Sequence, residues 1–148
     1  MGFTEAIRHN FSHYADFSGR AQRSQYWWWF LFVFIVQLVL GLIDSIFGLY
    51  IGGSTTAVMI GDTSVPIVSQ GIGVLQSIWV LAVLIPNLAV IARRLHDTEH
   101  SAWWLLWIFL LTFVCFIGVI FWLVFMLQKG TPGPNKYGSD PLGQPPAV

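Results

Sequence analysis

Residues 26–50 read YWWWFLFVFIVQLVLGLIDSIFGLY and contain a single charged side chain, Asp44. A helix of this length rises about 36 Å, which exceeds the roughly 30 Å hydrocarbon core of a bilayer. Aromatic residues stand at both ends of the run, as is typical of side chains at the two membrane interfaces. The run is longer than the apolar core of a secretory signal. It therefore predicts a retained transmembrane helix.

The composition of the whole chain supports a membrane protein. Hydrophobic residues make up 55% of the 148 positions, against seven basic and seven acidic residues. A soluble domain of this size could not cover so much apolar surface. The zero net charge indicates no nucleic-acid partner. The lone Cys115 excludes an intrachain disulfide and a cysteine metal cage.

Two further apolar runs, 72–92 and 102–127, complete the predicted spans. The fold class is therefore an all-α integral membrane protein with a three-helix transmembrane bundle. Pro86 predicts a kink in the second span. The third run could also fold back near Gly118 as a hairpin, but each half would reach only about 20 Å. One long helix is the simpler prediction, and residues 51–71 predict a loop with at most a short extended stretch.

Outside the transmembrane domain, 26–127, the sequence predicts an arm at 1–25 and a flexible tail at 128–148 that is rich in Pro and Gly. Within the arm, residues 3–17 place apolar side chains at helical spacing on one face. This pattern is typical of an amphipathic helix in the membrane interface. A helix that packs on its own protein would show the same pattern.

The distribution of basic residues predicts the topology. The loop after the first span carries no Lys or Arg. The arm and the segment after the second span carry five cations: Arg8, Arg20, Arg23, Arg93 and Arg94. The positive-inside rule puts these segments, and thus the N-terminus, in the cytoplasm. Lys129 and Lys136 of the tail would prefer the same side, which requires an even number of crossings. Three spanning helices would put the tail outside.

Residues 92–104, ARRLHDTEHSAWW, gather most of the charge of the membrane domain. Each Arg or Asp at a bilayer centre costs about 2.5–3.5 kcal/mol, so this cluster must lie at the interface or face a polar interior. If the second helix continues past Ala92, Asp97 can pair with Arg93 or Arg94 across one turn. Arg20 or Arg23 could meet the same carboxylate from another helix.

Two interpretations of this charged cluster stay open. The cations can simply bind acidic headgroups and so fix the topology. Alternatively, they form a recognition site for a headgroup phosphate or another anion, for which the tail would supply Asn135 and Lys136. That candidate site consists of Arg20, Arg23, Arg93, Arg94, His96 and Asp97.

No catalytic or metal site is predicted, and no cofactor is expected. The histidine pairs 9/13 and 96/100 have the i,i+4 spacing of a chelating pair, but such pairs arise often by chance. Asp44 is interpreted as a solvated carboxylate at the outer interface. His96 and Asp97 are the only plausible acid–base pair. No nucleophile elbow or phosphate-binding glycine loop is present, so an enzyme is not expected.

Several stretches together resemble a bacterial inner-membrane family, domain of unknown function 805. They are FSGRAQRSQYWWW, IPNLAVIARRLHDT, SAWW, FIG and GTPGPNKYGSDP, in this order. The resemblance implies a small polytopic protein of the bacterial inner membrane without an established activity. The motif residues are Gly19, Arg20, Arg23, Tyr26, Trp27, Pro86, Arg93, Arg94, Leu95, His96, Asp97, Ser101, Trp103, Trp104, Gly118, Asn135, Gly138 and Pro141.

The chain departs from the family pattern at three places. Members usually carry a glycine and then a basic residue where this chain has Glu99 and His100, which lowers the positive charge beside the cluster. They often carry a proline where this chain has Cys115. The loop at 51–71 and the third apolar run are longer than is typical.

Three functions compete at this point. The first is a non-enzymatic scaffold, sensor or accessory subunit that contacts membrane lipids and associates with itself or other membrane proteins. The second is a component of a small-solute or ion permease, suggested by Asp44, Gln37, Gln76 and the break at Pro86–Asn87. The third is recognition of anionic lipid headgroups.

Overall fold

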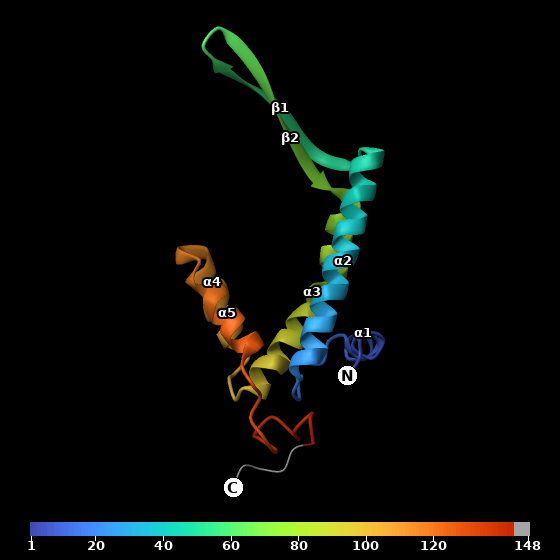
Figure 1. Cartoon of the computed structure of the whole chain (residues 1–148), viewed down its shortest axis with the longest axis vertical. Coiled ribbons are helices and arrows are strands. Elements are labelled where there is room, and N and C mark those ends of the chain that lie inside the picture. Colours follow the sequence, from blue (N-terminus) through green and yellow to red (C-terminus); the bar gives the residue numbers. More distant parts are fainter. Residues whose placement is uncertain (144–148) are drawn as a thin grey trace. The chain divides into compact units, whose positions relative to one another are not determined.

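The computed structural model describes residues 1–143, except for the side chains of 54–60, 63–70 and 115. The chain divides into two compact units, Met1–Phe32 with Leu84–Val148, and Val33–Val83. In chain order the elements are α1 (Phe3–Ser12), α2 (Arg23–Phe47), β1 (Tyr50–Ile60), β2 (Thr63–Gly73), α3 (Val74–Asp97), α4 (Trp104–Cys115) and α5 (Ile117–Leu127) (Figure 1).

The helices α2 and α3 are long and apolar enough to cross a membrane, with 25 and 24 residues. Their surfaces carry exposed apolar side chains such as Leu42, Ile46 and Leu81. Lipid accommodates such surfaces without the cost that water would impose. The first span begins three residues earlier than predicted. The second continues through Asp97, so the RRLHD sequence forms the last turns of α3 and not the loop after it.

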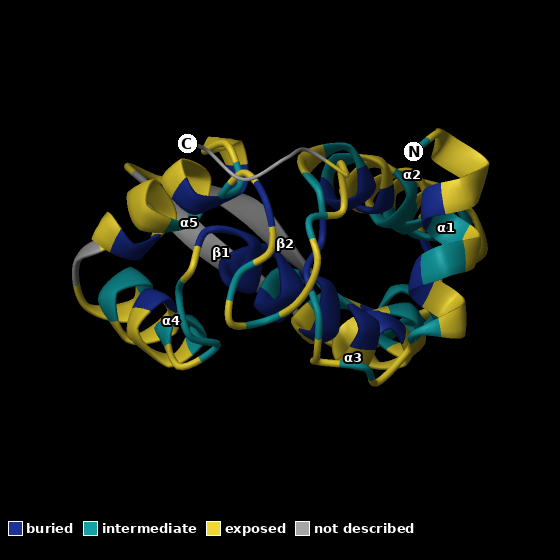
Figure 2. Cartoon of the chain, turned by 90° about the horizontal axis from the view of Figure 1, so that it is seen from below, coloured by how far each residue is buried: buried dark blue, intermediate teal, exposed yellow. Residues whose placement is uncertain are grey.

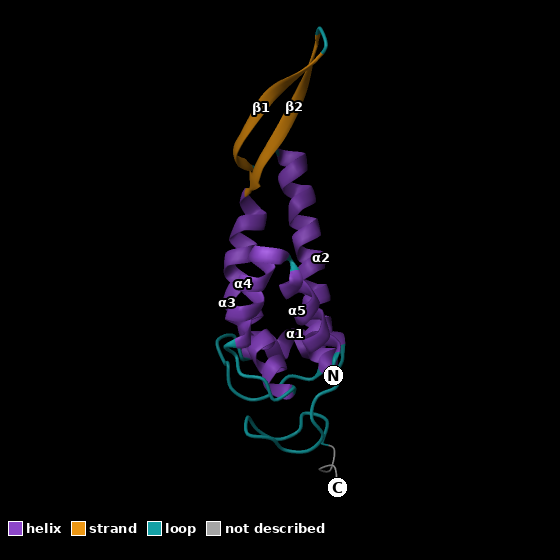
Figure 3. Ribbon diagram, turned by 90° about the vertical axis from the view of Figure 1, so that its left-hand side faces the viewer, coloured by secondary structure: helices purple, strands orange, loops and turns teal. Residues whose placement is uncertain are grey.

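The prediction of an all-α fold needs a correction between the two long helices. Residues 51–71, predicted as a loop, belong to an antiparallel hairpin paired from Tyr50 with Gly73 to Ile60 with Thr63 (Figure 3). Gly61 and Asp62 form its two-residue turn, and Gly61 has a φ of +63°. Turns of this kind favour glycine because their backbone is left-handed. The sequence of the two strands is rich in Thr, Val and Ile, which prefer extended backbone.

The prediction of one long third helix is wrong. The run breaks at Phe116, whose φ of +57° caps α4 with a bond from its N–H to the carbonyl of Thr112 (3.1 Å). The chain then returns as α5, in contact with α4. Gly118 permits this, since a Cβ there would overlap the Ile108 carbonyl. The hairpin forms without the proline that the resemblance implies at position 115. Each arm rises less than about 20 Å, too little to span a bilayer.

The N-terminal helix α1 packs on the aromatic start of α2. The rings of Phe3 and Trp28 lie 5.7 Å apart, and those of Phe11 and Trp29 lie 5.1 Å apart. Ala6 is fully buried, whereas Phe3 and Phe11 keep about two fifths of their surface exposed. The predicted helix over 3–17 ends earlier, at Ser12. Figure 2 shows the exposed residues along α1, as well as along α4 and α5.

Asp44 is buried, which corrects its interpretation as a solvated carboxylate. Its two oxygens accept hydrogen bonds from the backbone N–H groups of Leu75 (3.1 Å) and Gln76 (3.0 Å) in the first turn of α3. A carboxylate satisfies the free N–H groups of a helix start and interacts favourably with the helix dipole. A Cβ at Gly73 would collide with this carboxylate. Asp44 therefore helps to fix where α3 begins.

Candidate functional site

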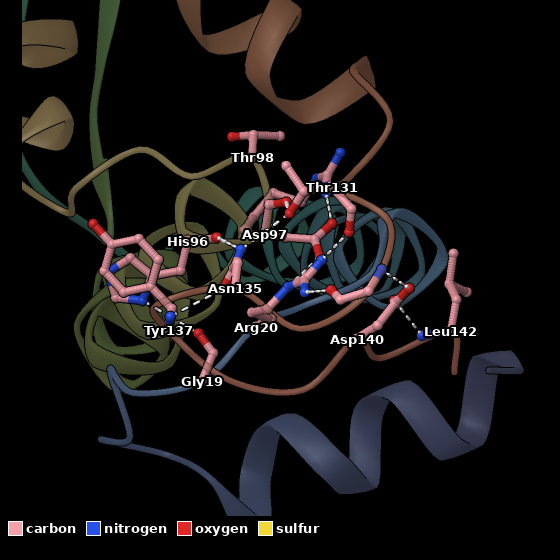
Figure 4. A network of polar contacts seen from close by, with 12 residues as sticks. Gly19, Arg20, His96, Asp97, Thr98, Thr131, Asn135, Tyr137, Asp140 and Leu142 are labelled. Carbon is pink, nitrogen blue, oxygen red and sulfur yellow. Dashed lines mark hydrogen bonds and ion pairs between the residues drawn. The ribbon is translucent and has the colours of Figure 1, made fainter. Parts of the chain in front are cut away.

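Asp97, at the end of α3, is the centre of a buried ionic cluster in the first unit. Arg20 donates from Nε to one carboxylate oxygen of Asp97 at 2.9 Å, and Arg94 donates from Nη1 to the other. All three side chains are at most about one tenth exposed. Arg20 comes from the segment between α1 and α2, 77 residues away in sequence. The carboxylate thus joins α3 to the N-terminal arm (Figure 4).

The same two arginines hold the chain that follows α5. Arg20 donates to the carbonyls of Gly133 (2.6 Å) and Thr131 (2.5 Å), and Arg94 donates to the carbonyl of Gln128. The backbone of Thr131 in turn donates to the carbonyl of Asp97 at 2.9 Å. Residues 128–143 contain neither a helix nor a strand. These contacts nevertheless attach their first part to the end of α3.

A second set of contacts extends the attachment to residue 137. The His96 ring stacks on that of Tyr137, with centroids 4.0 Å apart and planes 5° apart. Its Nδ1 lies 3.2 Å from the carbonyl of Gly19, to which it donates. Asn135 donates to the carbonyl of His96 at 3.0 Å. The ammonium of Lys136 instead lies over the ring of Tyr137, 4.9 Å from its centroid. Of the two tail residues singled out by sequence, Asn135 therefore reaches the cluster.

We call this arrangement the Asp97 clasp. It consists of Arg20, Arg94, His96, Asp97, Thr131, Gly133, Asn135 and Tyr137.

Arg93 lies outside the clasp and attaches α3 to α1. Its Nη2 donates to Asn10 Oδ1 at 2.9 Å, and its backbone carbonyl accepts from the N–H of Ala21 at 3.0 Å. Gln25 Nε2 donates to the same Asn10 oxygen (3.1 Å) and lies 3.0 Å from Nδ1 of His9. Burial and the neighbouring His13 and Arg93 hold the pKa of His9 below its ordinary value. A neutral His9 ring can accept the amide hydrogen of Gln25.

Arg23 is the one member of the predicted arginine set that stays at the surface. Its Nη1 donates a long hydrogen bond of 3.4 Å to the Leu127 carbonyl at the end of α5. With Lys129 it lines a pocket of about 230 Å³ beside Asp97. Neither cation forms an ion pair with any residue between 1 and 143. The four arginines that the sequence grouped together thus have three different environments.

Sequence reasoning missed several residues that hold α3 to the rest of this unit, within the clasp and beside it. Asn10 and Gln25 carry no charge and match no motif, and their roles depend on how α1 packs. Gly130 was also missed, because its role is to leave space: a Cβ there would overlap the carboxylate of Asp97. Tyr137, which stacks on His96, lies in the GTPGPNKYGSDP stretch, and this motif was the available signal.

The two histidine pairs have different surroundings. The rings of His9 and His13 stack with centroids 4.2 Å apart. His100 packs against Phe125, with centroids 4.5 Å apart, while His96 contacts Tyr137. Among the described residues, no three His, Cys, Asp or Glu side chains lie close enough together to hold a metal ion.

An apolar groove of about 740 Å³ lies between α3 and α4. Its lining includes Leu88, Ile91, Leu105, Phe109 and Trp122, with His96 and Ser101 as polar members. In a bilayer, acyl chains can fill such a groove without any protein partner. The groove therefore does not by itself indicate a docking site.

Comparison with known proteins supplies the family. The family described as "Protein of unknown function (DUF805)" matches residues 14–139. This chain belongs to the DUF805 family. The matched range includes the whole Asp97 clasp, from Arg20 to Tyr137.

Two curated relatives are similar to this DUF805 chain over most of their length. The inner membrane protein YhaH of Escherichia coli K12 is 40% identical over 133 residues, which cover 90% of this chain and 93% of YhaH. The inner membrane protein YhaI of the same strain is 38% identical over 129 residues, 87% of this chain and 88% of YhaI. No solved structure matches this DUF805 chain.

Proposed function

We propose that this chain is a non-enzymatic, multi-pass protein of the bacterial inner membrane that acts as a scaffold or accessory subunit. In this proposal the Asp97 clasp closes the cytoplasmic end of the membrane domain. The observation that carries the proposal is that both Asp97 oxygens and the terminal nitrogens of Arg20 and Arg94 are bound to the protein itself. Their chemistry therefore serves to join segments of the chain.

The proposed topology has two crossing helices, α2 and α3, and a re-entrant hairpin, α4–α5. The contacts of Arg20, Asp97 and Thr131 support it, because they bring the arm, the end of α3 and the tail to one place. All seven basic residues then share one side of the membrane. The positive-inside rule assigns that side to the cytoplasm. The names of YhaH and YhaI support the inner membrane as its location.

The surroundings of His96 and Asp97 argue against an enzyme. A general base must reach the proton that it removes, within hydrogen-bond distance. Asp97 is 3% exposed and already binds two guanidinium groups. His96 is covered by the ring of Tyr137. Opening this site for a substrate would separate a buried ion pair, and removing one partner of such a pair typically costs about 3–5 kcal/mol.

A permease component is the alternative, and it has weaker support. Two of the polar side chains that suggested it are engaged within the second unit: Asp44 caps α3, and Gln76 Nε2 donates to the carbonyl of Gln37 at 3.3 Å. A polar pathway would need groups that can contact a passing solute. Reconstituted liposomes test this alternative directly. Uptake or conductance in protein-containing vesicles, absent from empty ones, would favour the permease over the scaffold.

Photocrosslinking in native membranes tests the scaffold proposal. A photoreactive residue would replace, in turn, Ile46 of α2, Leu81 of α3 and Phe113 of α4, which are all exposed and apolar. Leu142 in the tail is the matched control, since it is also exposed and apolar but lies outside the helices. We expect at least one helix position to give a discrete adduct that also co-purifies without crosslinking. Adducts with lipid alone at all three positions would contradict a scaffold.

A further inference from the structure

The pocket beside the Asp97 clasp has two exposed cations in its lining, and neither forms an ion pair within residues 1–143. It is lined by Gln22, Arg23, Asp97, Lys129, Gly130 and Leu142. Its volume of about 230 Å³ is several times the roughly 30 Å³ that one water occupies in the liquid. A phosphate group fits in such a space, and the guanidinium of Arg23 matches the geometry of phosphate oxygens.

Arg23 and Lys129 differ from the other basic residues around them. The guanidinium groups of Arg20 and Arg94 are buried and bound to Asp97 and to backbone carbonyls. Both lining cations are exposed, and within residues 1–143 neither has a carboxylate partner. A surface cation without a partner attracts anions, whereas a paired one is already compensated.

The carboxylate of Asp97 also lines this pocket and would repel an anion on its own. Arg20 lies 2.9 Å from one of its oxygens, and Arg94 contacts the other. Two guanidinium groups thus face one carboxylate, so the wall that Asp97 presents carries a net positive charge. With Arg23 and Lys129 added, the local charge is four positive groups against one negative group.

The position of the two cations along their helices fits a membrane surface. Arg23 is the first residue of α2, and Lys129 follows the last residue of α5, Leu127, by two positions. The hydrogen bond from Arg23 to the Leu127 carbonyl shows that these two helix ends adjoin. Away from these two adjoining ends, the sequences of α2 and α5 are almost entirely apolar. Their ends lie where hydrocarbon would give way to headgroups.

We propose that Arg23 and Lys129 form a binding site for a phosphate group at the cytoplasmic end of α2 and α5. The phosphate is that of an anionic phospholipid headgroup or of a free phosphate ion, and the same two side chains would bind either. This site goes beyond the scaffold proposal, because a scaffold needs no bound anion. It also differs from the four-arginine site expected from sequence. Of those four arginines only Arg23 takes part, and Lys129 joins it.

Binding of the detergent-purified full chain to vesicles tests the site. The probes are vesicles of phosphatidylcholine with and without phosphatidylglycerol, and inorganic phosphate added alone or as a competitor. The variants are Arg23→Gln, Lys129→Gln and the double substitution. Lys136→Gln and Arg8→Gln are the matched controls, because each removes one exposed positive charge outside the pocket. A thermal melt of each variant checks that the clasp stays folded.

We expect each pocket substitution to weaken the association with phosphatidylglycerol about fivefold and the double substitution about 25-fold. Binding to phosphatidylglycerol that free phosphate does not displace supports a lipid ligand. If the substitutions weaken binding of inorganic phosphate but not of phosphatidylglycerol, the ligand is a free ion. Equal weakening by the controls would overturn the proposal, since it would show a general charge effect. Unchanged binding by a folded double variant would also overturn it. Neither result bears on the crosslinks that test the scaffold.

Discussion

Gly130 leaves room for Asp97: a methyl group in place of its hydrogen would overlap both carboxylate oxygens. The glycine lies directly before Thr131, whose N–H donates to the Asp97 carbonyl at 2.9 Å. The first residues after α5 can therefore reach the clasp only with no side chain at position 130. Close approach of backbone to another group is a common reason for a glycine.

The substitution Gly130→Ala should therefore destabilise the attachment of the tail. We expect a loss of about 1–3 kcal/mol, the range typical of overpacking, and faster proteolysis after residue 127. Thermal unfolding in detergent and limited proteolysis measure the two effects. Gly2→Ala is the control, because a Cβ at Gly2 meets no atom within 4 Å. Equal stability of the two variants would contradict the observed packing.

The buried pair of Arg20 and Asp97 should behave as a coupled unit. Asp97→Asn leaves the buried Arg20 and Arg94 without a carboxylate, and we expect it to cost about 3–5 kcal/mol. Arg20→Gln leaves Asp97 paired with Arg94 alone, and we expect it to cost less. The double variant should lose clearly less than the sum of the two. A double-mutant cycle of unfolding free energies measures this coupling. Simple additivity would show that the two side chains do not interact.

Glu99, two residues after Asp97, has a left-handed backbone with a φ of +62°. A non-glycine residue there costs about 1–2 kcal/mol, and the unfolded chain regains part of this when glycine is introduced. Glu99→Gly should therefore raise the unfolding free energy by up to about 1 kcal/mol. Glu99→Ala removes the same charge but keeps the strained backbone, so no gain is expected from it. An equal gain in unfolding free energy from Glu99→Gly and Glu99→Ala would show that the removed charge, and not the backbone, causes the effect.

The docking of α1 should weaken in acid. Burial, followed by His13 and Arg93, lowers the pKa of His9 from its ordinary 6.5, while Glu5 and Asp16 oppose the shift. The folded state thus favours the neutral ring, and this stability is complete above about pH 6.5. It is lost as the pH falls through the lower pKa of the folded state.

Hydrogen exchange of α1 between pH 7.5 and 5 measures this effect. Protection of the α1 amides, corrected for intrinsic exchange rates, should fall with pH in the wild type. His9→Gln cannot take up the proton, so its protection should change less. An identical pH dependence in both proteins would exclude His9 as the cause.

Composition and charge were enough to predict part of this fold. The runs at 26–50 and 72–92 are apolar over a full bilayer thickness, so helices were expected there and were found at Arg23–Phe47 and Val74–Asp97. The pairing of Arg20 and Arg94 with Asp97 was among the alternatives, because Arg94 lies one helical turn before Asp97 and Arg20 lies at the matching depth before the first span.

Other features depend on contacts that no local pattern records. A hairpin near Gly118 was an alternative from sequence, but its turning residue, Phe116, is neither proline nor glycine, and the break depends on the packing of Gly118 against α4. The burial of Asp44 follows from the nearby start of α3, which its own helix does not reveal. The sequences of the strands β1 and β2 contain no charged residue and are rich in β-branched residues. Gly, Ser and Pro within them made a loop the simpler prediction.

In the proposed topology the arm, the end of α3 and the tail lie together on the cytoplasmic side. Reporter fusions to the two termini, active in only one compartment, measure this most directly in intact cells. We predict that the reporters at both ends are cytoplasmic, because two crossings and a re-entrant hairpin return the chain to its starting side. A periplasmic C-terminal reporter beside a cytoplasmic N-terminal one would contradict the account, since Arg20 and Thr131 could then not share the Asp97 clasp.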